Sequence, residues 1–297
     1  MATQDVTLVW SPGTGESYPG DKRKTVLETR TMGTALVQKL DPRVHGAWAG
    51  YDASFGPVST SGLGGESHHD SRQIGKARVL EVAREHPGLL MIGGYSQGGE
   101  VSWELMQEMH RGQHADVFGR VIGFVNISNP CRTRSNFAPG KVIEIGNVQN
   151  KIGWGVANRT GTGEVPRRPV FEAVNPADAM CNADPDSLLR DLNDLIDRME
   201  FELNAKGQIT VPAITAWLVR ALSDAHRRNQ LATLLAIAPF RITRAVLELR
   251  GYLDPKLGEH TLYANPARGP YGNGVAYTTY LAQAVNAKLP EMIAARR

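Results

Sequence analysis

The chain of 297 residues is long enough for one large α/β domain, or for such a domain with an insertion. Hydrophobic residues make up 41% of the sequence, enough for a sizeable core, and the formal net charge at pH 7 is only +3. The basic residues are scattered, which argues against a dedicated nucleic-acid-binding protein. No apolar run approaches the roughly 18 residues of a membrane span, so we expect no transmembrane segment.

The chain opens with MATQDVTLVW, which has no basic start and leads directly into a predicted strand. A secretory signal peptide would begin with basic residues followed by an apolar core. We therefore expect synthesis in a cytoplasm without a signal peptide, and any export by another route.

Predicted strands and helices alternate along the first part of the chain. The expected strands cover 6–10, 44–51, 89–92, 121–127 and 169–174, with local extended structure at 141–147. The expected helices cover 24–39, 71–86, 97–111 and, at the end of the chain, 275–289. The polar segment 55–70 is predicted to be a long loop. This alternation is typical of α/β proteins, in which a parallel sheet carries helices on both faces.

The pattern changes to almost continuous helix between Asp184 and Gly251. We predict one α/β domain made of residues 1–183 and 252–297, interrupted by a helical subdomain at 184–251. Apolar residues recur at helical spacing in this insertion, as at Leu188, Leu192 and Ile196. Packing among the helices would explain such a stripe, and a surface that binds lipid would also explain it.

The segment LLMIGGYSQGGEV, residues 89–101, contains the G-x-S-x-G pattern of a nucleophile elbow. A buried strand ends at Gly94, the chain turns sharply at Ser96, and a helix follows. Gly94 and Gly98 come close together in such a turn, where a Cβ at either position would clash. The turn raises the Ser96 hydroxyl above the sheet and directs the backbone N–H of Gln97 toward a developing oxyanion.

An elbow serine needs a histidine base and a carboxylate that orients the base, in the chain order Ser, acid, His. Of the eight histidines, only His226 and His260 follow a plausible acid. His226 lies inside a predicted helix and His260 in a loop, so we favour His260 as the base. For the acid we favour Asp178, which lies just past a predicted strand, over Asp184, which helix capping explains fully.

The second oxyanion donor is expected from the Gly-rich loop SPGTGES that follows the first strand. Its glycines allow the backbone to approach closely, and the N–H of Thr14 or Gly15 could serve. The loop is not a phosphate-binding loop, because the required lysine is missing.

Two other features contain residue types that can bind metals. The sequence HHD at 68–70 places two histidines side by side, but adjacent side chains point apart in an extended chain, so we expect a solvated loop. Cys131 and Cys181 show no metal-ligand spacing, and both follow predicted strands. Either a disulfide between them or two buried thiols fits the sequence. The proposed chemistry needs no metal and no organic cofactor.

Several motifs now form an ordered set along the chain: GTG, GYSQGG, NISNP, NPADAMC and HTLYANP. In this order they resemble the lysin B family of mycobacteriophages, relatives of the cutinases, over nearly the whole chain. The resemblance implies a cutinase-like α/β-hydrolase fold, a three-layer sandwich with a mostly parallel central sheet. It carries the family's triad over to Ser96, Asp178 and His260, and its oxyanion hole to Thr14 and Gln97.

The resemblance also implies an activity. It is hydrolysis of the ester that joins mycolic acids to arabinogalactan, at the host cell envelope during phage-induced lysis. We expect a monomer. A general cutinase-like lipase or esterase acting on shorter acyl esters would share every catalytic residue. A cysteine or metal hydrolase is a weaker alternative because neither cysteine lies at an elbow, and a non-catalytic binding module on the same fold is the alternative of a different class.

Overall fold

The computed structural model describes residues 5–55, 66–132, 141–147, 154–157, 167–184, 187, 189–190, 193 and 259–296. The predicted helical insertion lies outside these residues except for a few positions up to 193, and His226 lies outside them as well. The division into a catalytic domain and an inserted subdomain therefore stays a prediction.

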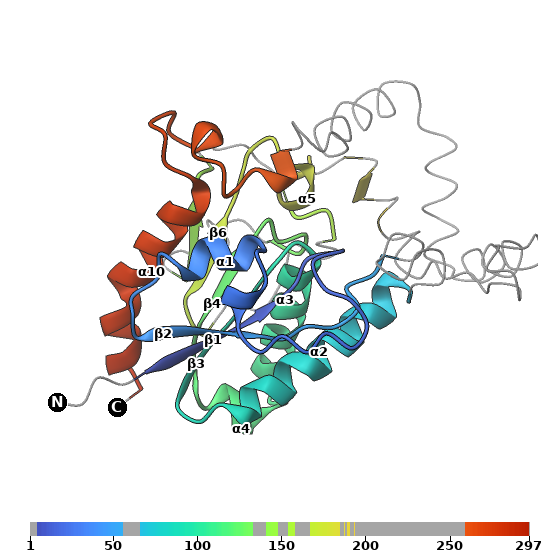
Figure 1. Cartoon of the computed structure of the whole chain (residues 1–297), viewed down its shortest axis with the longest axis vertical. Coiled ribbons are helices and arrows are strands. Elements are labelled where there is room, and N and C mark those ends of the chain that lie inside the picture. Colours follow the sequence, from blue (N-terminus) through green and yellow to red (C-terminus); the bar gives the residue numbers. More distant parts are fainter. Residues whose placement is uncertain are drawn as a thin grey trace, which may run out of the picture.

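Six strands form one parallel sheet in the order β2-β1-β3-β4-β6-β5 (Figure 1). They are β1 (Val6–Ser11), β2 (Val44–Trp48), β3 (Leu89–Tyr95), β4 (Val121–Ile127), β5 (Val142–Ile145) and β6 (Val170–Ala173). Every residue of the central strands β3 and β4 is buried. Continuous apolar runs are expected where both faces of a parallel sheet are covered, so the predicted α/β class with a parallel sheet is confirmed.

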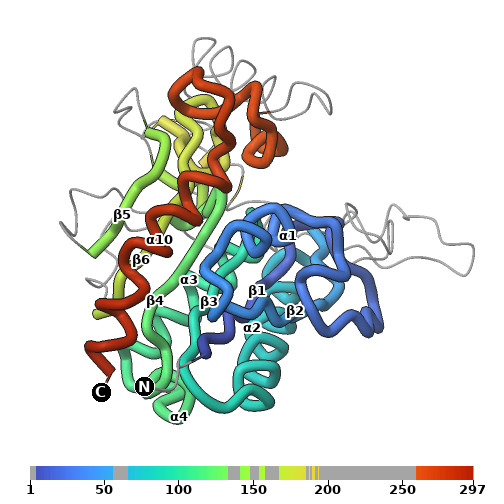
Figure 2. Tube along the Cα trace, turned by 60° about the vertical axis from the view of Figure 1, so that its left-hand side comes forward, coloured from blue at the N-terminus to red at the C-terminus, as the bar shows by residue number. Residues whose placement is uncertain are grey.

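Two hydrophobic cores lie on opposite faces of the sheet. Trp10 and Met91 belong to the core under α1 and α10, whereas their chain neighbours Val9 and Ile92 belong to the core under α2 and α3. Successive strand residues point to opposite faces, so each central strand contributes to both cores. The result is a three-layer arrangement, with α10 running along β4, β5 and β6 (Figure 2). The helices are α1 (Met32–Val37), α2 (His68–Glu85), α3 (Gln97–His110), α4 (Ala115–Phe118), α5 (Ala179–Asn182) and α10 (Tyr277–Ala294).

The long helix predicted over residues 24–39 is wrong. The structure has a 3₁₀ turn at Val26–Glu28, a break, and then the short helix α1. At the break Arg30 adopts a left-handed conformation with φ of 56°. The hydroxyls of Thr29 and Thr34 both donate to the Val26 carbonyl oxygen, at 2.7 and 2.9 Å. Such side-chain bonds compete with the helical ladder, which apolar spacing alone does not reveal.

The solvated loop predicted around the HHD sequence is also wrong. Residues 68–70 form the first turn of α2, which is capped by Ser67, whose hydroxyl accepts from the Asp70 N–H at 3.1 Å. His68 is buried, with Nε2 3.6 Å from a carboxylate oxygen of Glu100 and Nδ1 3.1 Å from Arg72. A capping serine and a buried charged neighbour thus replace solvent as the partners of this turn.

Candidate active site

The G-x-S-x-G turn joins β3 to α3 at the carboxyl edge of the sheet. Ser96 has φ of 54° and ψ of −120°, a conformation that L residues rarely adopt. A Cβ on Gly94 would lie 2.2 Å from the Gly98 carbonyl carbon, and a Cβ on Gly98 would lie 2.1 Å from the Ser11 oxygen. Both positions therefore require glycine, and the backbone strain at Ser96 is held by this close packing.

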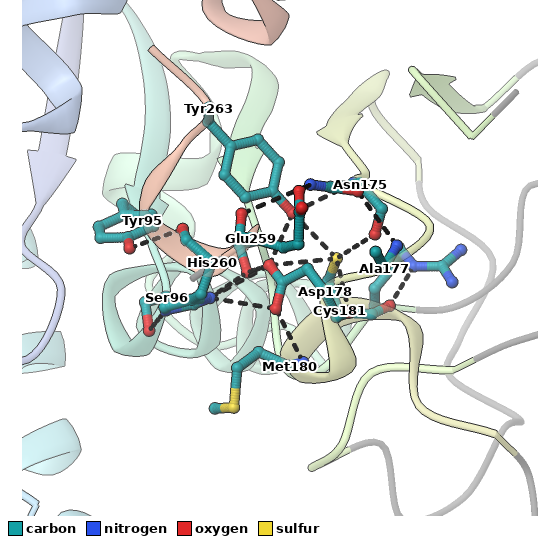
Figure 3. A network of polar contacts seen from close by, with 12 residues as sticks. Tyr95, Ser96, Asn175, Ala177, Asp178, Met180, Cys181, Glu259, His260 and Tyr263 are labelled. Atoms are coloured by element: carbon teal, nitrogen blue, oxygen red, sulfur yellow. Dashed lines mark hydrogen bonds and ion pairs between the residues drawn. The ribbon is translucent and has the colours of Figure 1, made fainter. Parts of the chain in front are cut away.

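His260 lies in a 3₁₀ turn, Glu259–Thr261, that leads toward α10. Its Nε2 is 2.9 Å from the Ser96 hydroxyl oxygen, although the two residues are far apart in the sequence (Figure 3). The imidazole is buried and stacks on the ring of Tyr95, with ring centroids 5.1 Å apart. The turn is tied to the end of β6 because the Asn175 side-chain amide donates to the Glu259 carboxylate at 2.7 Å.

Asp178 is the carboxylate that meets the other nitrogen of the imidazole. Its Oδ2 and Oδ1 lie 3.1 and 3.3 Å from His260 Nδ1 (Figure 3). As the N-cap of α5, Asp178 also accepts from the Met180 N–H at 3.0 Å, and the Tyr263 hydroxyl donates to Oδ2 at 2.7 Å. Burial alone would raise the pKa of Asp178, but the imidazole and these donors hold it below its ordinary value.

One member of this network has no counterpart in the sequence analysis. Ser128, the first residue after β4, is fully buried and donates a short hydrogen bond to Asp178 Oδ2. Its hydroxyl oxygen is also 2.8 Å from His260 Nδ1. The motif NISNP contains Ser128, and a serine at the carboxyl end of a central parallel strand is the signal that could have identified it.

The backbone N–H groups of the Gly-rich loop have different partners. The Gly13 N–H donates to the Glu16 carboxylate at 2.9 Å, and the Gly15 N–H donates to the Ala53 oxygen at 3.1 Å. Among the described residues, the N–H groups of Thr14 and Gln97 have no acceptor. The Thr14 hydroxyl donates to the Gln97 side-chain oxygen at 3.4 Å, so the Gly-rich loop lies against the first residue of α3. The arrangement favours Thr14 over Gly15 as the loop donor.

Glu16 holds this loop in place and was not identified from the sequence. Its carboxylate accepts from the Gly13 N–H and, with the other oxygen, from the Met32 N–H, each at 2.9 Å. It thus joins the Gly-rich loop to the first residue of α1. Burial raises the pKa of Glu16, although these two N–H groups and the charge of His260 oppose the rise.

Cys131 and Cys181 are buried thiols that are not joined by a disulfide. Cys181 Sγ lies 3.2 Å from the Tyr263 hydroxyl and 3.8 Å from Asp178 Oδ2, directly behind the carboxylate (Figure 3). Burial raises the pKa of the Cys181 thiol, so the thiol stays protonated. Of the two alternatives left open by the sequence, the structure has the pair of thiols.

The described part of the chain contains neither a cluster of metal ligands nor a membrane-spanning helix. No group of three or more His, Cys, Asp or Glu side chains is placed to hold a metal ion there. None of the helices described is both long enough and apolar enough to cross a bilayer.

The strand–turn–helix at Ser96, the chain order Ser, Asp, His and the parallel sheet together define an α/β-hydrolase fold. No protein-family model and no curated protein matches the sequence. The chain is similar in structure to lysin B from mycobacteriophage D29, with 12% identity and a TM-score of 0.48 over 95% of this chain and 99% of that one. It is also similar to a cutinase-like protein from Cryptococcus sp., with 18% identity and a TM-score of 0.42 over 61% of this chain and 82% of that one.

Proposed function

We propose that this protein is a serine esterase in which Ser96 is the nucleophile, His260 the general base and Asp178 the carboxylate that orients the base. The observation that carries the proposal is the 2.9 Å contact between Ser96 Oγ and His260 Nε2, with Asp178 at the opposite nitrogen. A nucleophile in hydrogen-bond reach of a base that a third group orients is the arrangement required for acyl transfer.

The reaction follows from this geometry in two halves. His260 Nε2 takes the Ser96 proton as the serine oxygen attacks the ester carbonyl, and the oxyanion accepts from the N–H groups of Thr14 and Gln97. His260 then protonates the leaving alcohol, which leaves an acyl group on Ser96. Water, deprotonated by the same imidazole, releases the acid and restores the serine. No step requires a metal or an organic cofactor.

For the substrate we propose the ester between mycolic acids and arabinogalactan, cleaved at the envelope of the host cell by a monomeric enzyme. The support is the ordered set of motifs that resembles the lysin B family, from GTG to HTLYANP. The alternative is a general cutinase-like esterase on shorter acyl esters, because Ser96, Asp178 and His260 would serve both substrates equally.

Hydrolysis of p-nitrophenyl butyrate tests the esterase assignment. Wild-type protein should turn over this ester, and Ser96→Ala should lose turnover by about 10⁴-fold or more while keeping the fold. Ser102→Ala is the matched control, because Ser102 is a fully buried serine of α3, the helix that follows Ser96, and should retain activity. Equal rates for Ser96→Ala and wild type would contradict the assignment, and an inactive wild-type protein would favour the binding module.

Purified mycolyl-arabinogalactan tests the substrate separately. Wild-type protein should release free mycolic acid, and Ser96→Ala should not. Turnover of the short ester without any release of mycolic acid would reject the mycolate substrate and support the general esterase.

A further inference from the structure

Ser128 occupies a place that the three-residue mechanism does not use. It follows β4 directly, is fully buried, and lies between the carboxylate of Asp178 and the imidazole of His260. Its φ of 50° is in the left-handed region, where a non-glycine residue is uncommon. Residues held in such conformations cluster at functional sites, so the backbone here points to a role for the side chain.

The direction of each hydrogen bond follows from the chemistry of the partners. An ionised carboxylate can only accept, so the Ser128 hydroxyl proton goes to Asp178 Oδ2. The Ser128 oxygen, 2.8 Å from His260 Nδ1, is then left as an acceptor, and Nδ1 must carry a proton. The other nitrogen of the His260 imidazole, Nε2, consequently presents a lone pair to the Ser96 hydroxyl 2.9 Å away. This is the tautomer that a general base requires.

We propose that Ser128 is a positioning residue of the active site. It holds the side chains of Asp178 and His260 in their correct relative positions and fixes the His260 tautomer. The inference rests on the proposed esterase function. The His260 Nδ1–H is shared between the Ser128 oxygen at 2.8 Å and the Asp178 oxygens at 3.1 and 3.3 Å. Ser128 therefore supplies the shortest of the contacts that hold this proton.

The backbone of Ser128 is held independently of its hydroxyl. Its N–H donates to the Ala173 oxygen at 3.1 Å, which continues the pairing of β4 with β6. Loss of the hydroxyl should therefore leave the sheet intact. Replacement by glycine should also relieve the left-handed backbone, because glycine adopts positive φ without steric cost. If Ser128 had only a structural role, Ser128→Gly should keep the wild-type kinetics. If Ser128 positions Asp178 and His260, Ser128→Gly should keep the wild-type stability but have a lower kcat.

Other titratable and aromatic groups face the His260–Asp178 pair. The charge of His260 lowers the pKa of Glu16 in the Gly-rich loop, and Tyr95 of β3 stacks on the imidazole. Tyr263 and Cys181 face the Asp178 carboxylate. The neighbouring Glu259 of the same turn is paired with Arg268 and with Asn175. All of these stay in place when only the Ser128 hydroxyl is removed, so a change in the pH profile reports on that hydroxyl.

The experiment compares Ser128→Gly and Ser128→Ala with wild type and with the control Ser102→Ala. The measurements are kcat and KM for p-nitrophenyl butyrate from pH 5 to 9, urea denaturation, and the downfield proton NMR resonance of His260 Nδ1–H. Both Ser128 variants should lower kcat by about tenfold or more and leave KM nearly unchanged, because misplacement of the base slows the chemical step. The acid limb of the profile should also shift, because removing this donor raises the pKa of the Asp178 carboxyl, which is in contact with the imidazole.

Ser128→Gly with wild-type stability, lowered kcat and a shifted Nδ1–H resonance would establish the positioning role. Wild-type kcat, pH profile and resonance in Ser128→Gly would overturn it. The NMR measurement does not depend on turnover, so the two proposals can fail separately. If the wild-type protein is inactive but the His260 resonance still moves in Ser128→Gly, the esterase function is rejected and the contact between Ser128 and His260 is supported. If the enzyme is active and the resonance does not move, only the positioning role of Ser128 is rejected.

Discussion

The Tyr95 hydroxyl donates a hydrogen bond to the backbone carbonyl oxygen of His260 at 2.9 Å. Tyr95 is the last residue of β3 and directly precedes Ser96, so the strand that presents the proposed nucleophile also holds the turn that presents the proposed base. The ring of Tyr95 additionally stacks on the imidazole and covers Gly13, where an added Cβ would lie 2.6 Å from the ring. One side chain thus joins the elbow strand to the His260 turn and to the Gly-rich loop.

Tyr95→Phe should keep the ring packing and remove only the bond to the His260 carbonyl. We expect a loss of about 1 kcal/mol in the free energy of unfolding and a several-fold lower kcat, because the base turn is held less firmly. Urea denaturation and hydrolysis of p-nitrophenyl butyrate measure the two effects. Tyr280→Phe, which removes an exposed hydroxyl bonded to Asn273, is the control and should change neither. A fully active Tyr95→Phe would show that the hydroxyl does not position His260.

Asp178→Asn should be far more damaging than Asp184→Asn. The Asp178 oxygens face donors from Met180, Tyr263 and Ser128, so an amide must direct its own N–H₂ at one of them. The His260 tautomer is then lost, which costs about 10⁴-fold in kcat in a Ser-His-Asp site. Asp184→Asn should retain turnover, since asparagine caps a helix about as well as aspartate. Comparable losses of kcat in the two variants would mean that Asp178 is not the carboxylate that orients His260.

Glu16→Gln should weaken the proposed oxyanion loop without altering any hydrogen bond of Ser96, Asp178 or His260. The two Glu16 oxygens accept from Gly13 and Met32, and a glutamine can accept from only one of these N–H groups. We expect kcat to fall about tenfold as Thr14 is displaced from the developing oxyanion. Steady-state kinetics with p-nitrophenyl butyrate measure the effect. Glu28→Gln, which removes an exposed carboxylate on the following turn, is the control. An unchanged kcat in Glu16→Gln would show that the position of the Gly-rich loop does not affect stabilisation of the oxyanion.

Glu172 makes stability depend on pH in a defined window. It is fully buried in β6, accepts from Asn126 and Asn129 with one oxygen, and has no partner among the described residues for the other. Burial raises its pKa from 4.5 to about 7, against the effect of the two amides. Between these values the folded protein holds a proton that the unfolded chain has released, so stability is lost as the pH rises from about 4.5 to about 7.

Glu172→Gln should remove that loss. Relative to wild type, the variant should gain on the order of 3 kcal/mol in the free energy of unfolding between pH 5 and pH 8. Urea denaturation of both proteins at the two pH values measures the difference, in which the contributions of all other titrating groups cancel. A difference that does not change with pH would mean that Glu172 titrates normally.

Features that depend only on residues close together in the chain could be predicted from the sequence. Gly94, Ser96 and Gly98 are neighbours in the chain, so steric reasoning about one tight turn is enough to identify the elbow. The parallel sheet could be predicted because its central strands are buried on both faces and therefore read as apolar runs. Chain order reduced the candidates for the base to His260 and His226, and those for the acid to Asp178 and Asp184. The order of residues gives no distance between their side chains.

Which side chains contact one another at the site depends on the tertiary structure. The hydroxyl of Ser128 reaches Asp178 and His260, and Glu16 reaches Met32, through contacts between segments that are remote in the chain. No local pattern of residues encodes such contacts, because they depend on how strand ends converge at one edge of the sheet. The same holds for the break at Arg30 and the buried His68, where side-chain bonds and a buried charged partner outweighed hydropathy and loop composition.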